Sequence, residues 1–273
     1  KDMIIKMRVS QSLQPLIIAL YANSPFIENR LTNYMSFRSH IWTKTDKKRC
    51  GLLPFVYDES FSFERYVDYL LDIPMYFIIR DGKYKEMTKY TFKDFLKKKK
   101  NSIKIKPIFD DWKTHLTTVF PEVRLKNFIE IRGADGGPWS RVCALPAFWT
   151  GILYDEKNLN DIWLRVKSWK FHKIKEFYEN TRKFGLKTKT PDGQKLLDFA
   201  NVVINHSTEG LRRRKIILKG EDETIFLEPL KKIIESGKSP AEMWKKLFIH
   251  KWDNNIDMLY KTNYFKTLEN EKL

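Results

Sequence analysis

The spacing of apolar residues predicts helices along the first half of the chain. Between Leu13 and Tyr21, apolar side chains recur every three or four positions, which predicts a helix with Pro15 in its first turn. Because the residue before a proline is pushed out of the helical region, we expect this helix to end just before Pro25. The same spacing, with residues that favour an N-cap, predicts three further helices, which begin at Ser62, at Thr91 and at Asp110 or Asp111.

Alternating apolar residues and glycine turns predict two strand regions. Residues 74–84 contain an apolar strand, an Asp81-Gly82 turn and a returning strand, which is the pattern of a β-hairpin. Residues 127–132 alternate in the same way and then run into the glycine-rich stretch GADGGPW. The polar residues 27–50 show no clean period, so we expect a functional loop with short extended pieces there.

The second half of the chain has a helical pattern. Residues 141–155 predict an apolar helix that contains a proline, and amphipathic helices are expected from Glu156 to about Tyr264. We therefore predict an α+β fold in which residues 1–155 carry the strands and the chemistry. Residues 156–273 are expected to form a helical C-terminal region that packs on this core within the same domain. No apolar run reaches the roughly 18 residues that a membrane-spanning helix needs.

Composition narrows the class of protein. The 273 residues carry a formal net charge of +17, which can attract nucleic acid, an acidic membrane or small anionic substrates. Because no known nucleic-acid motif accompanies the charge, we favour a lysine-rich composition over a specific nucleic-acid role. The two cysteines, Cys50 and Cys143, make no disulfide framework, and no secretory signal occurs, so we expect a cytoplasmic protein.

Glu130 and Arg132 are the strongest candidates for chemistry. They lie two residues apart on a predicted strand and should point to the same face. An isolated acid–base pair of this kind is usually a surface ion pair that contributes little. The flanking glycines favour a site instead, because they permit turns and close approach of the backbone to a ligand. A carboxylate can hold Mg²⁺ and a guanidinium can clamp phosphate, so the pair fits a nucleotide phosphate with its metal.

Arg38 is a second candidate. It lies in SFRSHIW among aromatic and polar residues, and this setting favours a pocket that receives a carboxylate. The histidines lack the spacing of metal ligands, and neither a Walker loop nor a G-x-G-x-x-G motif occurs. Any ATP site is therefore expected on the face of a sheet.

Four stretches of the sequence together resemble glutamate–cysteine ligases of the plant and alphaproteobacterial type. They are NSPF, SFRSHIW, GLLPFVYDESFSFERYVDYLLDIPMYF and DWKTHLTTVFPEVRLKNFIEIRGADGGPWSRVCALPAFWTGILYD. The resemblance is nearly continuous from about Leu13 to Asp155 and is weaker beyond it. The short motifs NSP, S-x-R and E-x-R are shared among carboxylate–amine ligases more widely, whereas the long blocks are specific to this family.

The resemblance implies a reaction and a fold. In this family ATP phosphorylates the side-chain carboxylate of L-glutamate, and the amine of L-cysteine attacks the γ-glutamyl phosphate, in the first step of glutathione biosynthesis. The fold would include part of a glutamine-synthetase-like, antiparallel active-site sheet flanked by helices. ATP and Mg²⁺ would be the cofactors.

The resemblance also implies a role for individual residues. Glu130 would be a metal ligand, and Arg132 would be a catalytic, ATP-binding residue that contacts the transferred phosphate. Arg38 would hold a substrate carboxylate and would also be catalytic. The remaining residues implied to bind substrate are Tyr76, in the cysteine pocket, with Asn23, Ser24, Trp139 and Arg141.

Enzymes of this family are considerably longer than the chain. The resemblance therefore implies that the chain is the C-terminal part of a ligase, with the N-terminal part of the same enzyme as its partner. Because one glutamate cannot hold a metal cluster, we expect the chain alone to be inactive. No membrane and no specific nucleic acid is expected as a partner. Residues 96–111 contain no cysteine, so the thiol switch of plant members should be absent.

Two alternatives stay open. The first is another ATP-dependent carboxylate–amine ligase that uses a different amine. The second is a non-catalytic, basic protein, a relic of a ligase that binds nucleic acid.

Overall fold

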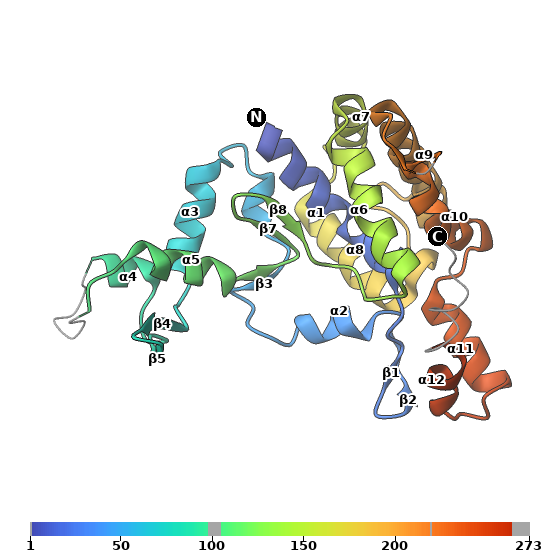
Figure 1. Ribbon diagram of the computed structural model, residues 1–273, viewed down its shortest axis with the longest axis horizontal. Coiled ribbons are helices and arrows are strands. Elements are labelled where there is room, and N and C mark those ends of the chain that lie inside the picture. Colours follow the sequence, from blue (N-terminus) through green and yellow to red (C-terminus); the bar gives the residue numbers. More distant parts are fainter. Residues whose placement is uncertain (1, 98–104, 219, 264–273) are drawn as a thin grey trace. The chain divides into compact units, whose positions relative to one another are not determined.

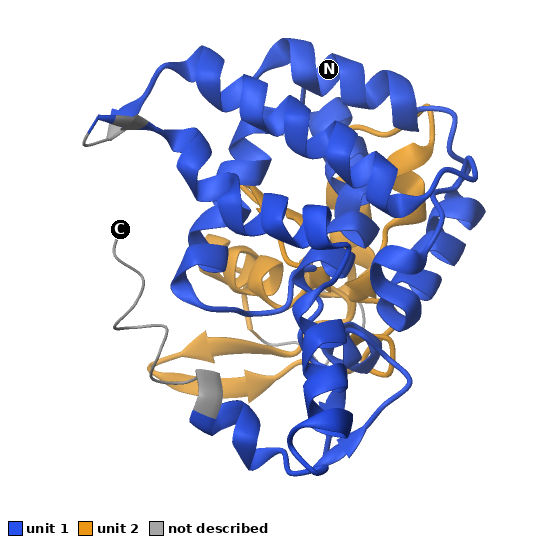
Figure 2. Ribbon diagram, turned by 90° about the vertical axis from the view of Figure 1, so that its right-hand side faces the viewer, with its two compact units in different colours: residues 1–41, 133–273 blue, residues 42–132 orange. Residues whose placement is uncertain are grey.

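The computed structural model describes residues 2–97, 105–218 and 220–263, and the chain forms two compact units (Figures 1 and 2). Unit 1 comprises residues 1–41 and 133–273, and unit 2 comprises residues 42–132. These units do not follow the boundary expected after Asp155. The expected assignment of residues 1–155 to a catalytic part and residues 156–273 to a helical part stays a prediction.

Unit 1 is mostly helical. Its core is built on α1 (Asp2–Tyr21), which is buried from Val9 to Tyr21 and packs along α7 and α8 (Figure 1). Its other elements are β1 (Phe26–Ile27), β2 (Arg30–Leu31), α2 (Phe37–Trp42, whose last residue opens unit 2), α6 (Trp139–Leu153), α7 (Glu156–Val166), α8 (Phe171–Phe184), η2 (Gly185–Lys187), α9 (Leu196–Arg214), β9 (Ile217–Leu218), β10 (Glu221–Asp222), η3 (Glu223–Leu227), α10 (Glu228–Ser236), α11 (Pro240–His250) and α12 (Asp257–Asn263).

The start of α1 was predicted wrongly. The helix begins at Asp2 rather than at Leu13, so Pro15 lies inside it and not in its first turn. Pro15 has no amide to donate to the Gln11 carbonyl, a loss of about 3 kcal/mol in a helix interior. Burial of Met7 and Val9 ahead of the proline offsets that loss, because the apolar surface continues upstream of it.

Two glycines bring α6 and α9 together in unit 1. A Cβ atom on Gly151 would lie 2.1 Å from the Ser207 carbonyl oxygen, and one on Gly210 would lie 2.0 Å from the Gly151 carbonyl oxygen. The close approach lets Ser207 Oγ donate to the Phe148 carbonyl at 3.0 Å. Glycine is therefore required at both positions for the packing of α6, the helix that follows the candidate site.

Unit 2 combines short helices with strand pairs. Its elements are β3 (Cys50–Gly51), η1 (Pro54–Tyr57), α3 (Phe63–Asp72), β4 (Phe77–Arg80), β5 (Lys83–Glu86), α4 (Phe92–Leu96), α5 (Phe109–Thr117), β6 (Phe120–Pro121), β7 (Val123–Leu125) and β8 (Ile129–Ile131). The strands pair as β4–β5 and β7–β8, both antiparallel, and as β3–β6, which is parallel. Met75, Ile78, Met87, Phe92 and Phe95 form a buried apolar cluster that joins β4 to α4.

Most of the predicted elements are confirmed. The helices predicted to begin at Ser62 and Thr91 and the one predicted over residues 141–155 are observed as α3, α4 and α6. Asp81 and Gly82 make the β4–β5 turn with φ angles of 52° and 71°. The predicted cap of α5 is wrong, because α5 begins at Phe109 and Asp111 instead accepts the Ile108 amide at 2.9 Å.

The fold class is confirmed at the level of a mixed, mostly helical α+β protein. Within the described residues every sheet has two strands, so these ranges contain no extended antiparallel sheet. Residues 98–104, part of the expected cysteine-free stretch, and Tyr264, the expected end of the helical region, lie outside the described residues. Of the helices in the described ranges, none combines the length and the apolar character that crossing a bilayer requires.

Candidate functional site

The β7–β8 pair places Glu130 beside an arginine of the neighbouring strand. Glu130 lies directly opposite Arg124 in the antiparallel register, with Val123 opposite Ile131 and Leu125 opposite Ile129. The side chains of Val123 and Leu125 are buried, and alternation turns Arg124 and Glu130 to the opposite face. The apolar residues thus fix the register that joins the acid to its partner.

Arg124 holds Glu130 with two nitrogens. Its Nε and Nη2 donate to Glu130 Oε2 at 3.0 and 2.7 Å, while Nη1 donates to the carbonyl oxygens of Thr117 and Val119 at 3.0 and 2.9 Å. Partial burial of Glu130 raises the pKa of its carboxyl, but hydrogen bonds from Arg124 and Arg132 outweigh this, and the pKa is lowered. Glu130 is therefore ionised at neutral pH.

Arg132 completes the cluster. Its Nη1 donates to Glu130 Oε1 at 2.6 Å, and its guanidinium lies 5.4 Å from the centre of the Phe120 ring. Lys126 Nζ lies 3.9 Å from Glu130 Oε2. Three cations thus surround one carboxylate, and the excess positive charge suits an anion such as phosphate.

The cluster does not by itself form a metal site. Both oxygens of Glu130 accept from guanidinium groups, so Mg²⁺ would have to displace these contacts next to positive charge. In the part of the chain that the structure describes, no three His, Cys, Asp or Glu side chains gather closely enough to hold a metal ion. Glu130 supplies the oxygen chemistry that Mg²⁺ prefers, but these residues alone do not fit the ion.

A separate polar cluster in unit 1 joins the NSP turn to the glycine-rich segment. Asp135 is buried, and its Oδ2 accepts from the Asn23 amide at 3.0 Å and from Ser24 Oγ at 2.7 Å. Its Oδ1 accepts from Ser36 Oγ at 2.7 Å. Asn23 Nδ2 also donates to the Gly136 carbonyl. The predicted residues Asn23 and Ser24 therefore contact the segment that follows the E-x-R motif.

Arg38 is brought together with Asn23 and Ser24 by this cluster. Its backbone amide donates to Ser24 Oγ at 3.1 Å, and its Nη1 donates to the Gly133 carbonyl at 3.2 Å. Arg38 is partly exposed and lies in the first turn of α2. A guanidinium that is held by a backbone carbonyl and is partly exposed to solvent can receive a carboxylate.

Tyr76 has a partner that the sequence did not reveal. The guanidinium of Arg49 lies 3.6 Å from the centre of the Tyr76 ring, and Arg49 is only 1% exposed. Arg49 also donates to Asp46 Oδ2 at 2.8 Å and to the carbonyl oxygens of Pro74 and Thr118. This buried stack fixes one face of the tyrosine.

Trp139 and Arg141 open α6 but differ in exposure. Trp139 is 60% exposed, whereas Arg141 is buried. A Cβ on Gly137 would lie 2.9 Å from Arg141 Nε, so glycine makes room for this side chain. The Arg141 carbonyl accepts from the Tyr21 hydroxyl at 3.0 Å, and burial raises the pKa of Tyr21, which keeps that hydroxyl protonated.

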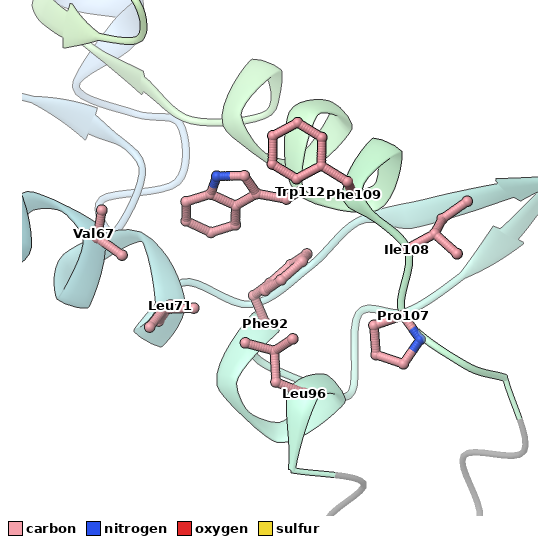
Figure 3. Close-up of a pocket in the computed structure, with 8 residues that line it drawn as sticks. All are labelled: Val67, Leu71, Phe92, Leu96, Pro107, Ile108, Phe109 and Trp112. Atoms are coloured by element: carbon pink, nitrogen blue, oxygen red, sulfur yellow. The ribbon is translucent and has the colours of Figure 1, made fainter.

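An apolar pocket in unit 2 lies apart from the predicted residues. It has a volume of about 470 Å³ and is lined by side chains of α3, α4 and α5 and by Pro107 and Ile108 (Figure 3). Its described lining contains neither Glu130, Arg132 nor Tyr76. The polar clusters, rather than this pocket, therefore carry the candidate chemistry.

Three functional candidates were missed by the sequence reasoning. Arg124, Asp135 and Arg49 each contact a predicted residue or its loop. A register signal for Arg124 was present, because residues 123–125 and 129–131 are two alternating runs joined by a short connection. Asp135 lies among glycines that were interpreted as a turn open to a ligand, with no role given to the acid itself, and no local pattern indicates the partner of Arg49.

Comparisons with known proteins agree with the resemblance. Residues 1–262 match the family model described as glutamate-cysteine ligase family 2. The chain is 47% identical over 261 residues to a chloroplastic glutamate–cysteine ligase of Solanum lycopersicum, with 95% of this chain and 49% of that protein covered. It is 46% identical over 262 residues to glutamate–cysteine ligase B of Oryza sativa subsp. japonica, also chloroplastic, with 96% and 52% covered. The Arabidopsis thaliana protein is 45% identical over 261 residues, with 95% and 49% covered.

These comparisons confirm the resemblance and correct one prediction. The match continues through the helical region to residue 262, and the chain spans about half the length of the curated relatives it matches. The expected cytoplasmic setting is wrong, because these relatives are chloroplastic proteins. The absence of a secretory signal in this stretch was not informative about an organelle.

Proposed function

This chain belongs to glutamate-cysteine ligase family 2, and from that premise we propose that the protein joins L-glutamate to L-cysteine with ATP. In the proposed reaction an oxygen of the glutamate side-chain carboxylate takes the γ-phosphoryl group of ATP and releases ADP. The cysteine amine then attacks the carbonyl carbon of the γ-glutamyl phosphate, loses a proton and expels phosphate. The product, γ-glutamylcysteine, would serve glutathione biosynthesis.

The Glu130 cluster is the observation that carries the proposal. Arg124, Arg132 and Lys126 surround one carboxylate and leave excess positive charge on this face. Phosphoryl transfer needs positioning and charge neutralisation more than covalent help from the protein. We assign Arg132, the arginine of the E-x-R motif, to the transferred phosphate, and Arg124, which donates to Glu130 and to two backbone carbonyls, to holding Glu130 in place.

The amino-acid substrates are assigned to the other predicted residues. Arg38, steadied by Gly133 and Ser24, would receive a substrate carboxylate. Tyr76, stacked on Arg49, would form part of the cysteine pocket. Asn23 and Ser24 would shape the loop around the substrate, and Trp139 and Arg141 would close its far side.

The proposal extends to the cofactor and the fold. We propose that the strand pairs of this chain belong to a glutamine-synthetase-like sheet of the whole protein. In this proposal residues 1–155 form the catalytic core, and residues 156–273 support it. Mg²⁺ would be bound by Glu130 only with additional oxygen ligands, because the described residues do not form its site alone. We accordingly expect the 273-residue chain, tested alone, to show no turnover.

Product analysis tests the proposal. We expect the protein expressed from its native start to form γ-glutamylcysteine and to release phosphate only when ATP, glutamate and cysteine are all present. Arg132→Met should lower kcat/KM by about 1000-fold or more, because an arginine on a transferring phosphoryl group contributes that much. The matched control is Arg212→Met, which removes an exposed arginine that pairs with Glu209 and should leave kcat/KM unchanged.

Other outcomes favour the alternatives. If phosphate release depends on glutamate but does not change when cysteine is added, the protein is a ligase of this chemistry that uses a different amine. If the full-length protein binds DNA or RNA in a salt-dependent way and shows no turnover, the proposal is overturned in favour of a non-catalytic nucleic-acid-binding protein.

A further inference from the structure

Asp135 is a buried acid that the reaction outlined above does not use. It is 4% exposed, and the three donors to its carboxylate are neutral groups, namely one backbone amide and two serine hydroxyls. Burial of a carboxylate is costly unless its oxygens accept hydrogen bonds. A buried carboxylate that accepts hydrogen bonds from three neutral donors indicates that the position of those donors matters.

Both hydroxyls that donate to Asp135 also accept hydrogen bonds from backbone amides of α2. Ser24 Oγ accepts from the Arg38 amide at 3.1 Å, and Ser36 Oγ accepts from the Ser39 amide at 3.1 Å. The remaining amide of this turn, that of Phe37, donates to the Ser24 carbonyl at 2.8 Å. Because each hydroxyl gives its only hydrogen to Asp135, its lone pairs face the helix. Asp135 therefore fixes the turn that carries Arg38.

The same segment also holds the side chain of Arg38. Gly133, two residues before Asp135, accepts from Arg38 Nη1 at 3.2 Å through its carbonyl oxygen. Asn23 Nδ2 donates to the Gly136 carbonyl, which ties the segment to the NSP turn on the other side. Residues 133–136 thus hold both parts of Arg38: its guanidinium directly, through the Gly133 carbonyl, and its backbone amide through Ser24 and Asp135.

We propose that Asp135 is a positioning residue, which acts through Ser24 and Ser36 to aim Arg38 at the carboxylate of an amino-acid substrate. This inference rests on the proposed function in one respect, the role of Arg38 in substrate binding. Asparagine at position 135 keeps the size of the side chain but has one accepting oxygen, and its amide group must donate. At least one serine would then have to turn its hydroxyl hydrogen away from residue 135, and the lone pair that accepts from its amide on α2 would move with it and weaken that hydrogen bond.

Amide exchange tests the positioning directly, without any need for turnover. We expect Asp135→Asn to speed the exchange of at least one of the Arg38 and Ser39 amides by about tenfold or more, as the weakening of a hydrogen bond implies. The matched control is Asp111→Asn, which alters another buried carboxylate, one that pairs with Arg80 at 2.6 Å. It should leave these two amides unchanged. Equal exchange in wild type and Asp135→Asn would overturn the proposal.

Substrate binding and steady-state kinetics separate this role from general damage. We expect Asp135→Asn to raise the Kd or KM for one amino-acid substrate by about tenfold, while the KM for ATP changes by less than about twofold. In Arg38→Ala, adding Asp135→Asn should cause little further loss, because the two residues act as one unit. Additive losses, or an equal rise in the KM for ATP, would show that Asp135 is only structural. If wild-type protein binds glutamate but forms no γ-glutamylcysteine, the proposed function fails while the exchange and binding results still decide the role of Asp135.

Discussion

Arg124 is the residue on which the geometry of the Glu130 cluster depends. It is nearly buried, and it connects two backbone carbonyls at the end of α5 with the carboxylate of Glu130. Arg132 Nη1 donates to an oxygen of the same carboxylate, Oε1, at 2.6 Å. Two arginines thus share a single carboxylate.

Replacing Arg124 by methionine tests this dependence. We expect Arg124→Met to lower the free energy of unfolding by about 2–3 kcal/mol, because it removes the donor to Oε2 of the partly buried Glu130 and to two carbonyl oxygens. Urea unfolding followed by circular dichroism measures the loss. Lys126→Met, which removes a cation 3.9 Å from the same carboxylate, should cost less than about 1 kcal/mol. Equal losses in the two variants would contradict the central place of Arg124.

At the residue scale, prediction from sequence succeeded where the signal was local. Glu130 and Arg132 share a face because strand side chains alternate, and the structure places their side chains in contact. Arg124 and Asp135 were missed because their partners are set by strand register and by a turn more than a hundred residues away in sequence. The pairing of Asp135 with the distant turn leaves no periodic trace in the chain, whereas the alternating runs 123–125 and 129–131 did carry the register of Arg124.

Among the elements of unit 2, α3 and α5 are joined through a buried histidine. Nε2 of His115 lies 2.8 Å from the Leu70 carbonyl oxygen at the end of α3, and the ring is 2% exposed. Burial lowers the pKa of His115, and the positive charge of Arg49 lowers it further, while the contact with Leu70 works against this. The folded protein therefore favours the neutral imidazole.

This histidine should make stability depend on pH. Above the unfolded value of about 6.5, His115 is neutral in both states and adds no pH dependence. As the pH falls below that value, the unfolded chain takes up a proton that the folded chain resists, so stability is lost until the lowered pKa is reached. We expect the free energy of unfolding to fall between pH 7 and 5, and to fall less steeply in His115→Gln than in wild type or in the exposed-site control His172→Gln. Equal slopes in all three proteins would contradict the assignment.

Element types were easier to predict than element limits. The Asp81-Gly82 hairpin and the amphipathic α3 carry strong local signals, and both form where expected. The start of α1 was misplaced because Pro15 is normally a signal for a first turn, whereas burial on both sides of it keeps the helix intact. Tertiary packing, which the local pattern does not contain, decided that boundary.

At the scale of the whole molecule, the chain presents its candidate chemistry in two units. The Glu130 cluster and the Tyr76–Arg49 stack belong to unit 2, whereas Arg38, Asn23, Ser24 and Asp135 belong to unit 1. The net charge of +17 favours the approach of anions to the chain, and the ATP proposed as substrate is one of them. Because the chain spans about half the length of its relatives, the complete reaction is proposed for the whole protein.

The most direct test of the central claim follows one oxygen atom through the reaction. The full-length protein is supplied with ATP, L-cysteine and L-glutamate labelled with ¹⁸O in the side-chain carboxylate. If that carboxylate is phosphorylated before the amine attacks, each phosphate released carries one labelled oxygen, and mass spectrometry will detect it. Phosphate released without the label, at the same rate as γ-glutamylcysteine forms, would contradict a γ-glutamyl phosphate intermediate and with it the role proposed for Arg132.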